Sequence, residues 1–394
     1  GAGSVNLTAS TSTGSGNIKW YTTLVGGTAE ATTSTGATWA TPSISATTVY
    51  YAEAVDGSCT SSPRTAVTAE VKGNPGGVSS NLHAWWKADA GTNTSTDDAI
   101  VSTWTDQSDN AWAANKGGNG ADYWENGINF NPMLKFPGNN ANHFKVTGGI
   151  YEGGQKASMF TYVVFNRHDG DHNMLYGQAH SSGLFGFGLN GNGYAYSYEG
   201  ANNANGNTNA AWGGNYNQTY LWSTGSAQNT STPQAGYRKY ITRDNNIVSR
   251  TNGVDQRSGG TNPFYIGYWG GWQLDGDMAE LIIYDGTPTA TEEDKIQSYL
   301  SVKYGITLAS MNYLSSDGTT IWDNAANSAY QYDIAGIGHD AGSGLLQKQS
   351  KSVNSDAIVT MSSEAIAVNN AANGTSLDNG EFLLWGNDNA SLST

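Results

Sequence analysis

Short runs of alternating apolar and polar residues dominate the first 73 residues of the chain. Residues 4–9, 48–55 and 65–71 alternate with the two-residue period of half-buried strands, and residues 17–22 carry Trp20, a candidate core side chain. Glycine-containing turn signals separate these runs. Short strands at this spacing predict a small β-sandwich over residues 1–73, which we expect to act as a spacer without a site of its own.

Longer strand signals follow a glycine- and proline-containing segment, residues 73–77, whose composition indicates a linker. Residues 160–165 (FTYVVF) form a continuous apolar run, which predicts a central strand covered on both faces. Further strand candidates are residues 184–189, 194–198, 219–222, 264–268 and 278–284. Together they predict two packed sheets, a jelly roll, over residues 77–308.

One segment has the three- and four-residue spacing of an amphipathic helix. Its apolar positions are Ile296, Tyr299, Leu300 and Tyr304. We expect Thr291 to cap its N-terminus, with the acidic residues 292–294 in the first turn facing the positive end of the helix dipole. Gly305 fits a left-handed cap at the C-terminus. The helix should dock its apolar face on the outside of the sandwich.

The pattern changes again after residue 308. Residues 334–338, 357–361 and 381–385 are strand candidates. We expect residues 309–394 to form a further small β domain, which residues beyond 394 would complete. The predicted fold class is therefore all-β, with two sandwiches, one docked helix and a final β segment.

Three stretches resemble a known kind of module. LHAWWKADAG (residues 82–91) and VSTWTDQSDNAWAA (101–114) resemble the start, and LDGDMAELIIYDG…IQSYLSVKYGITL (274–308) the end, of concanavalin-like (laminin-G-like) domains in very long surface proteins of Bacteroidetes. Residues 1–73 resemble the Ig-like repeats of the same proteins. The resemblance implies a fragment of a secreted cell-surface adhesin, part of a longer multidomain chain. It implies a fold more than a ligand, because this fold hosts many functions.

Charge and cysteine content narrow the partners. The net charge of −15 argues against nucleic acid, whose phosphates would be repelled, and is compatible with divalent cations. No run of about 18 apolar residues occurs, so we expect no membrane span here. Cys59 is the single cysteine. One interpretation is a reducing compartment; the other, which we prefer, is that related modules carry a cysteine before the first strand, so that the partner of Cys59 lies upstream of Gly1.

The sequence does not predict an enzyme. No nucleophile elbow surrounds a serine, and Cys59 lies far from every histidine in the sequence. Paired carboxylates for glycoside hydrolysis could come from Glu199, Asp275, Asp277 and Glu280, but none lies in a hydrolase-specific pattern. A carbohydrate-active enzyme on a jelly-roll fold therefore stays the alternative.

Three acidic regions are candidate metal sites. Residues 167–172 (RHDGDH) have ligand-type side chains, but their glycine and the preceding strand predict a polar hairpin loop. Calcium prefers carboxylate and carbonyl oxygens, which Asp106 in WTDQSDN and Asp275 with Asp277 in the closing strand offer. The laminin-G resemblance also implies a calcium ion at a rim site.

Aromatic residues beside glycines are the candidate ligand-binding residues. Tyr268, Trp269 and Trp272 lie in one loop (YWGGW), and Trp212 and Tyr216 in a second (WGGNY). Flat apolar rings suit the C–H faces of sugars, so we expect a polysaccharide or a cell-surface glycan as ligand. The paired glycines predict that at least one of the two tryptophans reaches solvent. A structural stalk without a ligand is the remaining alternative.

Overall fold

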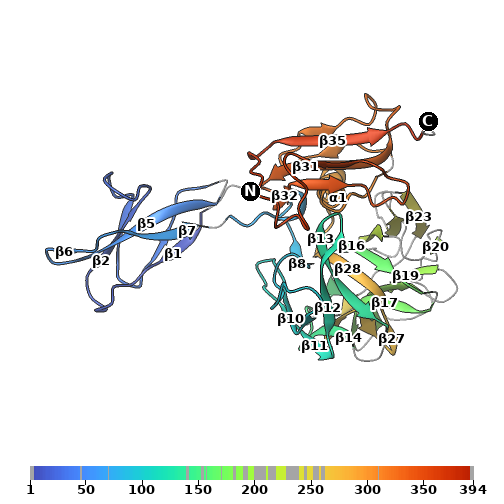
Figure 1. The fold of residues 1–394 in the computed structure, drawn as a ribbon. Coiled ribbons are helices and arrows are strands. Elements are labelled where there is room, and N and C mark those ends of the chain that lie inside the picture. Colours follow the sequence, from blue (N-terminus) through green and yellow to red (C-terminus); the bar gives the residue numbers. More distant parts are fainter. Residues whose placement is uncertain are drawn as a thin grey trace.

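The computed structural model describes residues 4–44, 47–69, 71–138, 142–151, 155–156, 158–169, 171–180, 183–189, 194–198, 210–211, 219–227, 239–243, 246–251, 257–258, 262–308 and 310–390. A small β domain at the N-terminus is joined through one stretch of chain to a larger body (Figure 1). Apart from one α-helix and one short 3-10 helix, the described elements are strands, which confirms the all-β prediction.

The N-terminal domain is a sandwich of two sheets. β1 (Asn6–Thr8) pairs with β4 (Thr38–Ala40), and the second sheet contains β3 (Ala31–Ser34), β2 (Asn17–Tyr21), β5 (Thr48–Asp56), β6 (Cys59–Thr60) and β7 (Thr65–Ala69). Trp20 is fully buried between the sheets, as predicted, and stacks on Trp39 with the ring centroids 5.2 Å apart. Cys59 is free and exposed on β6, at the end of the domain farthest from the larger body (Figure 1). We expect a partner for Cys59 upstream of Gly1, and residues 1–3 lie outside the described residues.

Two large antiparallel sheets form the body in the described part of the chain. The eight-stranded sheet has the order β10 (Thr103–Thr105), β11 (Ala113–Gly118), β14 (Asn142–Val146), β25 (Phe264–Ile266), β17 (Asn173–His180), β18 (Gly183–Leu189), β19 (Tyr194–Tyr198) and β20 (Ala210–Ala211). The nine-stranded sheet has the order β23 (Asn246–Thr251), β22 (Lys239–Arg243), β21 (Thr219–Ala227), β16 (Ser158–Arg167), β28 (Asp275–Tyr284), β13 (Asn131–Pro137), β12 (Ala121–Ile128) and β9 (Ile100–Val101), with β8 (Leu82–Lys87) paired to β28. The body also contains two separate two-stranded sheets. One pairs β15 (Gln155–Lys156) with β24 (Arg257–Ser258), and the other pairs β26 (Tyr268–Trp269) with β27 (Trp272–Gln273).

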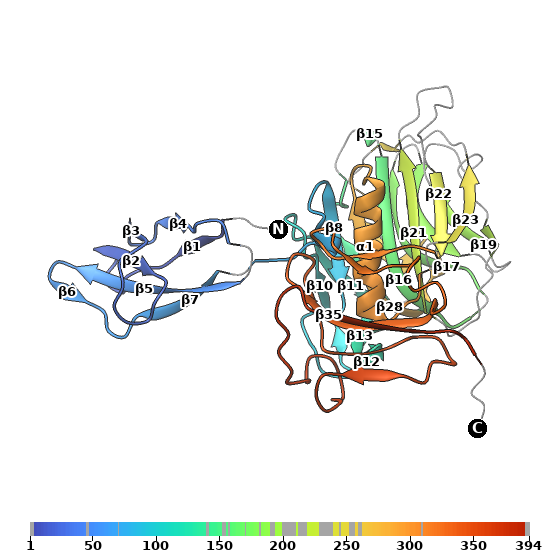
Figure 2. The same cartoon turned by 90° about the horizontal axis from the view of Figure 1, so that it is seen from above.

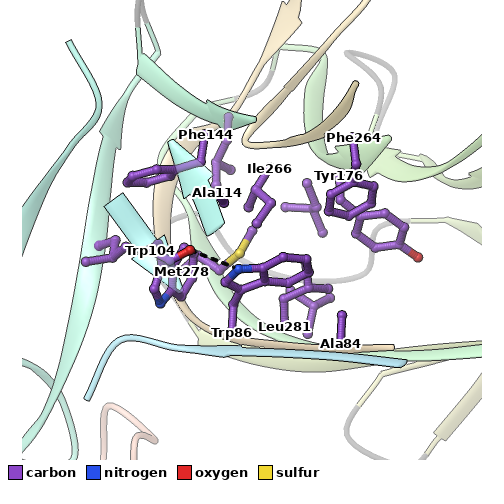
Figure 3. Close-up of a cluster of buried hydrophobic side chains, with 14 of the residues drawn as sticks. Ala84, Trp86, Trp104, Ala114, Phe144, Tyr176, Phe264, Ile266, Met278 and Leu281 are labelled. Atoms are coloured by element: carbon purple, nitrogen blue, oxygen red, sulfur yellow. Dashed lines mark hydrogen bonds between the residues drawn. The ribbon is translucent and has the colours of Figure 1, made fainter. Parts of the chain in front are cut away.

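The space between the two sheets is a closely packed aromatic and aliphatic core (Figure 3). Trp86 stacks on Phe264 from the opposite sheet with the ring centroids 5.5 Å apart, and its indole N–H donates to the carbonyl of Trp104. β16 lies between β21 and β28, with Val163 facing this core and Val164 facing the other side of its sheet. Both valines are at most 1% exposed, which confirms the doubly covered strand predicted from the apolar run.

The outer face of the nine-stranded sheet is covered by α1 (Ala290–Tyr304), as Figure 2 shows. The predicted apolar positions of the helix are all buried against the sheet, and Gly305 adopts the predicted left-handed cap. The N-cap prediction was wrong: Thr289 caps the helix, not Thr291. The Thr289 hydroxyl accepts from the amide of Glu292, whose carboxylate accepts from the amide of Thr289, so a reciprocal capping box fixes the start two residues earlier.

Residues after the helix lie over its other side. They form β29 (Tyr313–Leu314) with β30 (Thr320–Trp322), a three-stranded sheet of β32 (Leu345–Gln347), β31 (Tyr332–Asp340) and β35 (Phe382–Asn387), and β33 (Gln349–Lys351) with β34 (Thr360–Ser362). Tyr313, Ile334 and Leu345 share one hydrophobic core with α1 and the nine-stranded sheet. The helix therefore lies between the nine-stranded sheet and the C-terminal strands, and among the described residues the C-terminal strands have no separate core.

The segment predicted as a linker is packed into the body. Residues 75–77 form the 3-10 helix η1 (Pro75–Gly77), and Pro75 and Gly76 are buried. A Cβ at Gly76 would clash with the backbone of α1 at Lys295. The Tyr284 hydroxyl donates to the carbonyl of Val78, and the Asn74 amide donates to the carbonyl of Gly342. Glycine here serves close packing and not flexibility, which composition alone does not distinguish.

Candidate functional site

The β26–β27 hairpin presents the predicted aromatic loop. Trp269 and Trp272 are cross-strand partners, and the two residues between them, Gly270 and Gly271, have φ angles of 63° and 93°. Positive φ at both central residues is the requirement of a type I′ turn, which glycine meets without strain. A Cβ at either glycine would meet nothing within 4 Å, so the tip of the hairpin lies open. Trp272 is 37% exposed and Trp269 is half-buried, which confirms that at least one tryptophan reaches solvent.

Trp269 packs against the outer face of the eight-stranded sheet. Gly177 on β17 faces outwards there, and a Cβ built on it would lie 3.2 Å from both Cβ and Cγ of Trp269. Such a distance is shorter than nine in ten real Cβ contacts, so the indole would have to shift to accept a side chain there. Glycine at this strand position therefore leaves the space that the indole ring occupies.

A second ring covers a second glycine on the same face. His143 on β14 is opposite Gly117 on β11, where a Cβ would collide with the imidazole ring. Tyr268 stacks on His143 with the ring centroids 4.8 Å apart, and Tyr265 lies 5.5 Å from each of these rings. We call the set His143, Tyr265, Tyr268 and Trp269 the aromatic layer.

Strand alternation explains why the aromatic layer points outwards. On β14 the side chains of Asn142, Phe144 and Val146 are buried, whereas His143 and Lys145 between them are half-buried. Tyr265 alternates in the same way with its two buried neighbours on β25. Desolvation by burial, helped by the positive charge of Lys145, lowers the pKa of His143. The imidazole is therefore neutral at neutral pH, and its buried Nδ1 has no hydrogen-bond partner among the described residues.

The exposed Trp272 has a histidine partner from a neighbouring loop. Its indole stacks on His172 with the ring centroids 5.0 Å apart and an interplanar angle of 17°. His172 lies in the turn between β16 and β17, where the Asp169 carboxylate accepts from the amide of Asp171 and the side-chain amide of Asn173. His168 and His172 are four residues apart in this turn, which is the polar hairpin loop that the sequence predicts.

His168 lies between the two carboxylates at the start of β28. Its Nε2 is 2.8 Å from Oδ2 of Asp277, and its Nδ1 is 3.5 Å from Oδ1 of Asp275. Burial raises the pKa of both carboxyls, and the neighbouring carboxylate of Asp169 also raises that of Asp275. Asp277 is 1% exposed, and among the described residues its Oδ1 and the Oδ1 of Asn166 have no hydrogen-bond donor.

Asp106 does not join this pair. It is buried, and its carboxylate accepts from the amides of Trp85, Ser108 and Trp112 and from the Ser108 hydroxyl. Trp85 pairs with Ile282 on β28, five residues from Asp277, which at ~3.4 Å per residue is roughly 17 Å along the strand. Within the described ranges, no group of three or more His, Cys, Asp or Glu side chains is arranged to hold a metal ion.

The remaining predicted residues divide into two groups. Trp212, Tyr216 and Glu199 lie outside the described residues. Glu280 is fully buried under α1, where it accepts from the Trp85 indole, the hydroxyls of Tyr299 and Tyr304, and Lys303. A carboxylate enclosed by four donors beneath a helix is a structural group, because no substrate reaches it.

One pocket lies apart from the aromatic layer. It has a volume of about 250 Å³ and lies in the C-terminal segment, lined by Ser315, Ser316, Asp317, Thr319, Ile321, Asp340, Gly342, Asn379, Gly380 and Phe382. The Asp340 carboxylate accepts from the amide and hydroxyl of Ser316, and that of Asp317 from Ser315 and Thr319. These carboxylates hold the loops together.

Sequence reasoning missed His143, Tyr265 and His172. The first two belong to short strands whose alternation is a usable signal, because Phe144, Val146, Phe264 and Ile266 mark the inward positions. The glycines opposite them, Gly117 and Gly177, give no signal until the strand register is known. His172 was noted only as a metal-ligand type.

Two protein-family models match parts of the chain, one at the N-terminus and one at the C-terminus. Residues 1–73 match the family "Ig-like domain CHU_C associated", so the N-terminal domain is an Ig-like domain of this kind. Residues 292–394 match "Domain of unknown function (DUF8202)", which begins inside α1. No curated protein matches the chain. Within the described residues, no helix combines the length and hydropathy needed to cross a membrane.

Solved structures resemble the chain only distantly. Domain 4 of AbnA, a GH43 extracellular arabinanase from Geobacillus stearothermophilus in complex with arabinotriose, has a TM-score of 0.40 and 14% identity, covering 56% of this chain and 100% of that one. The binding domain of botulinum neurotoxin DC in complex with SialylT has a TM-score of 0.38 and 11% identity, over 57% of this chain and 52% of that one. Trypanosoma rangeli sialidase in complex with sialic acid has a TM-score of 0.36 and 10% identity, over 64% and 42%. Similarity this low assigns no activity or ligand to this chain.

Proposed function

We propose that this chain is a segment of a secreted cell-surface adhesin that binds polysaccharide or surface glycans non-covalently. The observation that carries the proposal is the aromatic layer, extended by the exposed Trp272 on an open hairpin. Sugar rings present flat C–H faces, and aromatic rings packed against a sheet provide a surface for them at a small entropic cost. The glycines beneath Trp269 and His143 make that surface a built feature of the sheet.

The positions of the candidate catalytic carboxylates favour binding without turnover over hydrolysis. Of the candidate pairs in the described residues, Glu280 is enclosed beneath α1, and Asp275 and Asp277 are both engaged by His168. Most glycoside hydrolases use two carboxyl groups that flank the scissile bond. We therefore propose a binding module and keep a carbohydrate-active enzyme as the alternative that a turnover assay tests.

The N-terminal domain supports a surface location. It belongs to an Ig-like family, and a small sandwich with its own core suits the role of a spacer in a long extracellular protein, such as those of Bacteroidetes. Repeated modules along such a chain would make weak individual sites sufficient, because the second binding event becomes intramolecular.

We also propose that calcium binds at Asp275 and Asp277. The donor-free Oδ1 atoms of Asp277 and Asn166 are buried acceptors, and a hard cation is the partner that such oxygens prefer. Calcium should raise the melting temperature in a titration monitored by thermal unfolding, and Asp277→Asn should abolish that increase. An unchanged melting temperature at millimolar calcium would reject the site, whatever the result for polysaccharide.

The test of the site uses tryptophan substitutions. Trp269→Ala and Trp272→Ala, singly and together, should weaken retention on immobilised polysaccharides chosen from a glycan array. Trp385→Ala is the matched control, since Trp385 is 45% exposed on β35 in the C-terminal segment. Full retention by a double variant with native circular dichroism would rule out this placement. An array without any bound glycan favours the structural stalk, and released reducing ends favour the enzyme.

A further inference from the structure

We propose that the aromatic layer recognises acidic sugars, with Lys145 as the group that pairs with the negative charge of the ligand. The inference rests on the proposed function and adds the chemical class of the ligand. A carboxylate of a uronic acid and a sulfate ester both present the required charge beside a sugar ring.

Strand register places Lys145 in a row of outward-facing positions across the eight-stranded sheet. Asn115 on β11 is the direct partner of Lys145, and Lys145 is the direct partner of Tyr265 on β25. Tyr265 in turn pairs with Gly177, the residue beneath Trp269. Directly paired residues of antiparallel strands share a face, so an amide, an ammonium group and the aromatic layer lie side by side.

The charge on this face is the opposite of that on the whole chain. The chain carries 33 acidic and 18 basic residues. Over the described strands β10, β11, β14 and β25, however, the outward positions hold no carboxylate: they are Thr103, Thr105, Ala113, Asn115, Gly117, His143, Lys145 and Tyr265. The part of the sheet around Lys145 therefore suits an anionic substituent, whereas the carboxylates of Asp169 and Asp171 lie in the turn beside Trp272.

Lys145 also lacks the carboxylate partner that Lys135 and Lys303 have. Lys135 pairs with Asp98 at 2.8 Å, and Lys303 pairs with Glu280 at 2.9 Å. Lys145 is half-buried, yet it forms no ion pair or hydrogen bond with any described residue through its ammonium group. Its charge is nonetheless felt locally, since it helps to lower the pKa of His143. An ammonium group without a carboxylate partner in the protein is available for a charge-assisted hydrogen bond with the ligand.

The geometry divides the recognition between the groups. Tyr265 and Tyr268 contact the apolar face of the sugar ring, Asn115 donates or accepts hydrogen bonds with its hydroxyl groups, and Lys145 binds the anionic substituent. Removing Lys145 should therefore affect acidic polysaccharides and leave ring stacking intact.

The experiment compares polygalacturonic acid with its methyl ester, which keeps the chain and removes the charge. Wild type should bind the acid about tenfold more tightly than the ester, the effect of one charge-assisted hydrogen bond. Lys145→Met should remove that preference, and Lys145→Arg should keep most of it. Lys19→Met is the matched control, because Lys19 is a half-buried lysine on a strand of the N-terminal domain. Dextran sulfate as a further probe tells a sulfate from a carboxylate as the preferred anion.

The results distinguish glycan binding itself from recognition of the negative charge by Lys145. Equal affinity for the acid and the ester, or an unchanged preference in Lys145→Met, overturns the assignment of charge while leaving glycan binding in place. Loss of all binding in the Trp269→Ala, Trp272→Ala double variant together with a Lys145-dependent preference supports both. If wild type binds none of the three polysaccharides and no glycan of the array, the proposed function fails, and this inference fails with it.

Discussion

Trp269 occupies the place that a side chain at residue 177 would need: a Cβ on Gly177 would lie 3.2 Å from the Cβ and Cγ of the indole. The two residues are more than 90 positions apart in the chain, and they meet because the β26–β27 hairpin packs against β17. A glycine in the middle of a strand weakens the strand. At Gly177 this cost is offset because the missing side chain leaves room for the indole of Trp269.

Substitution of Gly177 should therefore impair binding before it impairs folding. Gly177→Val forces the indole of Trp269 off the sheet, while the branched side chain suits a strand. We expect a marked loss of polysaccharide retention with a melting temperature close to that of wild type. Gly374→Val is the control, since a Cβ there has a single neighbour at 4.0 Å. Unchanged retention by Gly177→Val would show that the position of Trp269 is irrelevant to binding.

The helix cap gives a stability prediction with an internal control. Thr289→Ala removes the hydroxyl that accepts from the Glu292 amide and should cost about 1 kcal/mol, within the roughly 0.5–2 kcal/mol range of cap deletions. Thr291→Ala, two residues on, removes an exposed side chain and should change the free energy of unfolding by no more than ~0.5 kcal/mol. Urea denaturation of both variants measures the difference. Equal losses would contradict the capping box.

The buried ion pair beneath α1 should be sensitive to loss of one partner. Lys303→Met leaves the Glu280 carboxylate buried with neutral donors only, and we expect a loss of about 3–5 kcal/mol. Asp98→Asn breaks the ion pair with Lys135, in which Asp98 is mostly exposed, and should cost ~0–1 kcal/mol. Denaturant titration compares them. A Lys303→Met variant as stable as Asp98→Asn would mean that the ion pair of Lys303 with Glu280 does not stabilise the fold.

The raised pKa of Asp277 should make the stability of the fold depend on pH. Burial raises the pKa of its carboxyl, so folding favours the protonated form. The stability that this group contributes is fully present below the unfolded value of ~3.9 and is lost as the pH rises through the raised folded value. In chelator-containing buffer the melting temperature of Asp277→Asn should fall less than that of wild type between pH ~4 and neutrality. An identical pH profile for the two proteins would contradict the prediction.

Sequence patterns identified the elements whose periodicity is unambiguous. The apolar run at residues 160–165 is the doubly covered centre of β16, and the spacing of Ile296, Tyr299, Leu300 and Tyr304 marks the buried face of α1. The cap was misplaced because two threonines precede acidic residues, and only the reciprocal bonds of Thr289 with Glu292 distinguish them.

The site was harder to predict than the fold because its parts meet through long-range register. Tyr268, Trp269 and Trp272 were found from a local signature, whereas His143 and Tyr265 join them only through the pairing of β14 with β25. Asp106 has the residue type of a calcium ligand, but its oxygens are used by nearby amides. The glycines of residues 73–77 look like a flexible linker in composition and prove to be close-packing positions.

The docked segment around η1 also determines where mechanical load enters the body. Tension that arrives through the N-terminal domain meets a chain held by Tyr284 of β28, by the backbone of α1 and by the turn at Gly342. The pull is thus shared among the nine-stranded sheet, α1 and the C-terminal segment at once and does not peel one strand from a sheet edge. The aromatic layer lies on the opposite sheet, so a ligand could remain bound while the attachment point bears the strain.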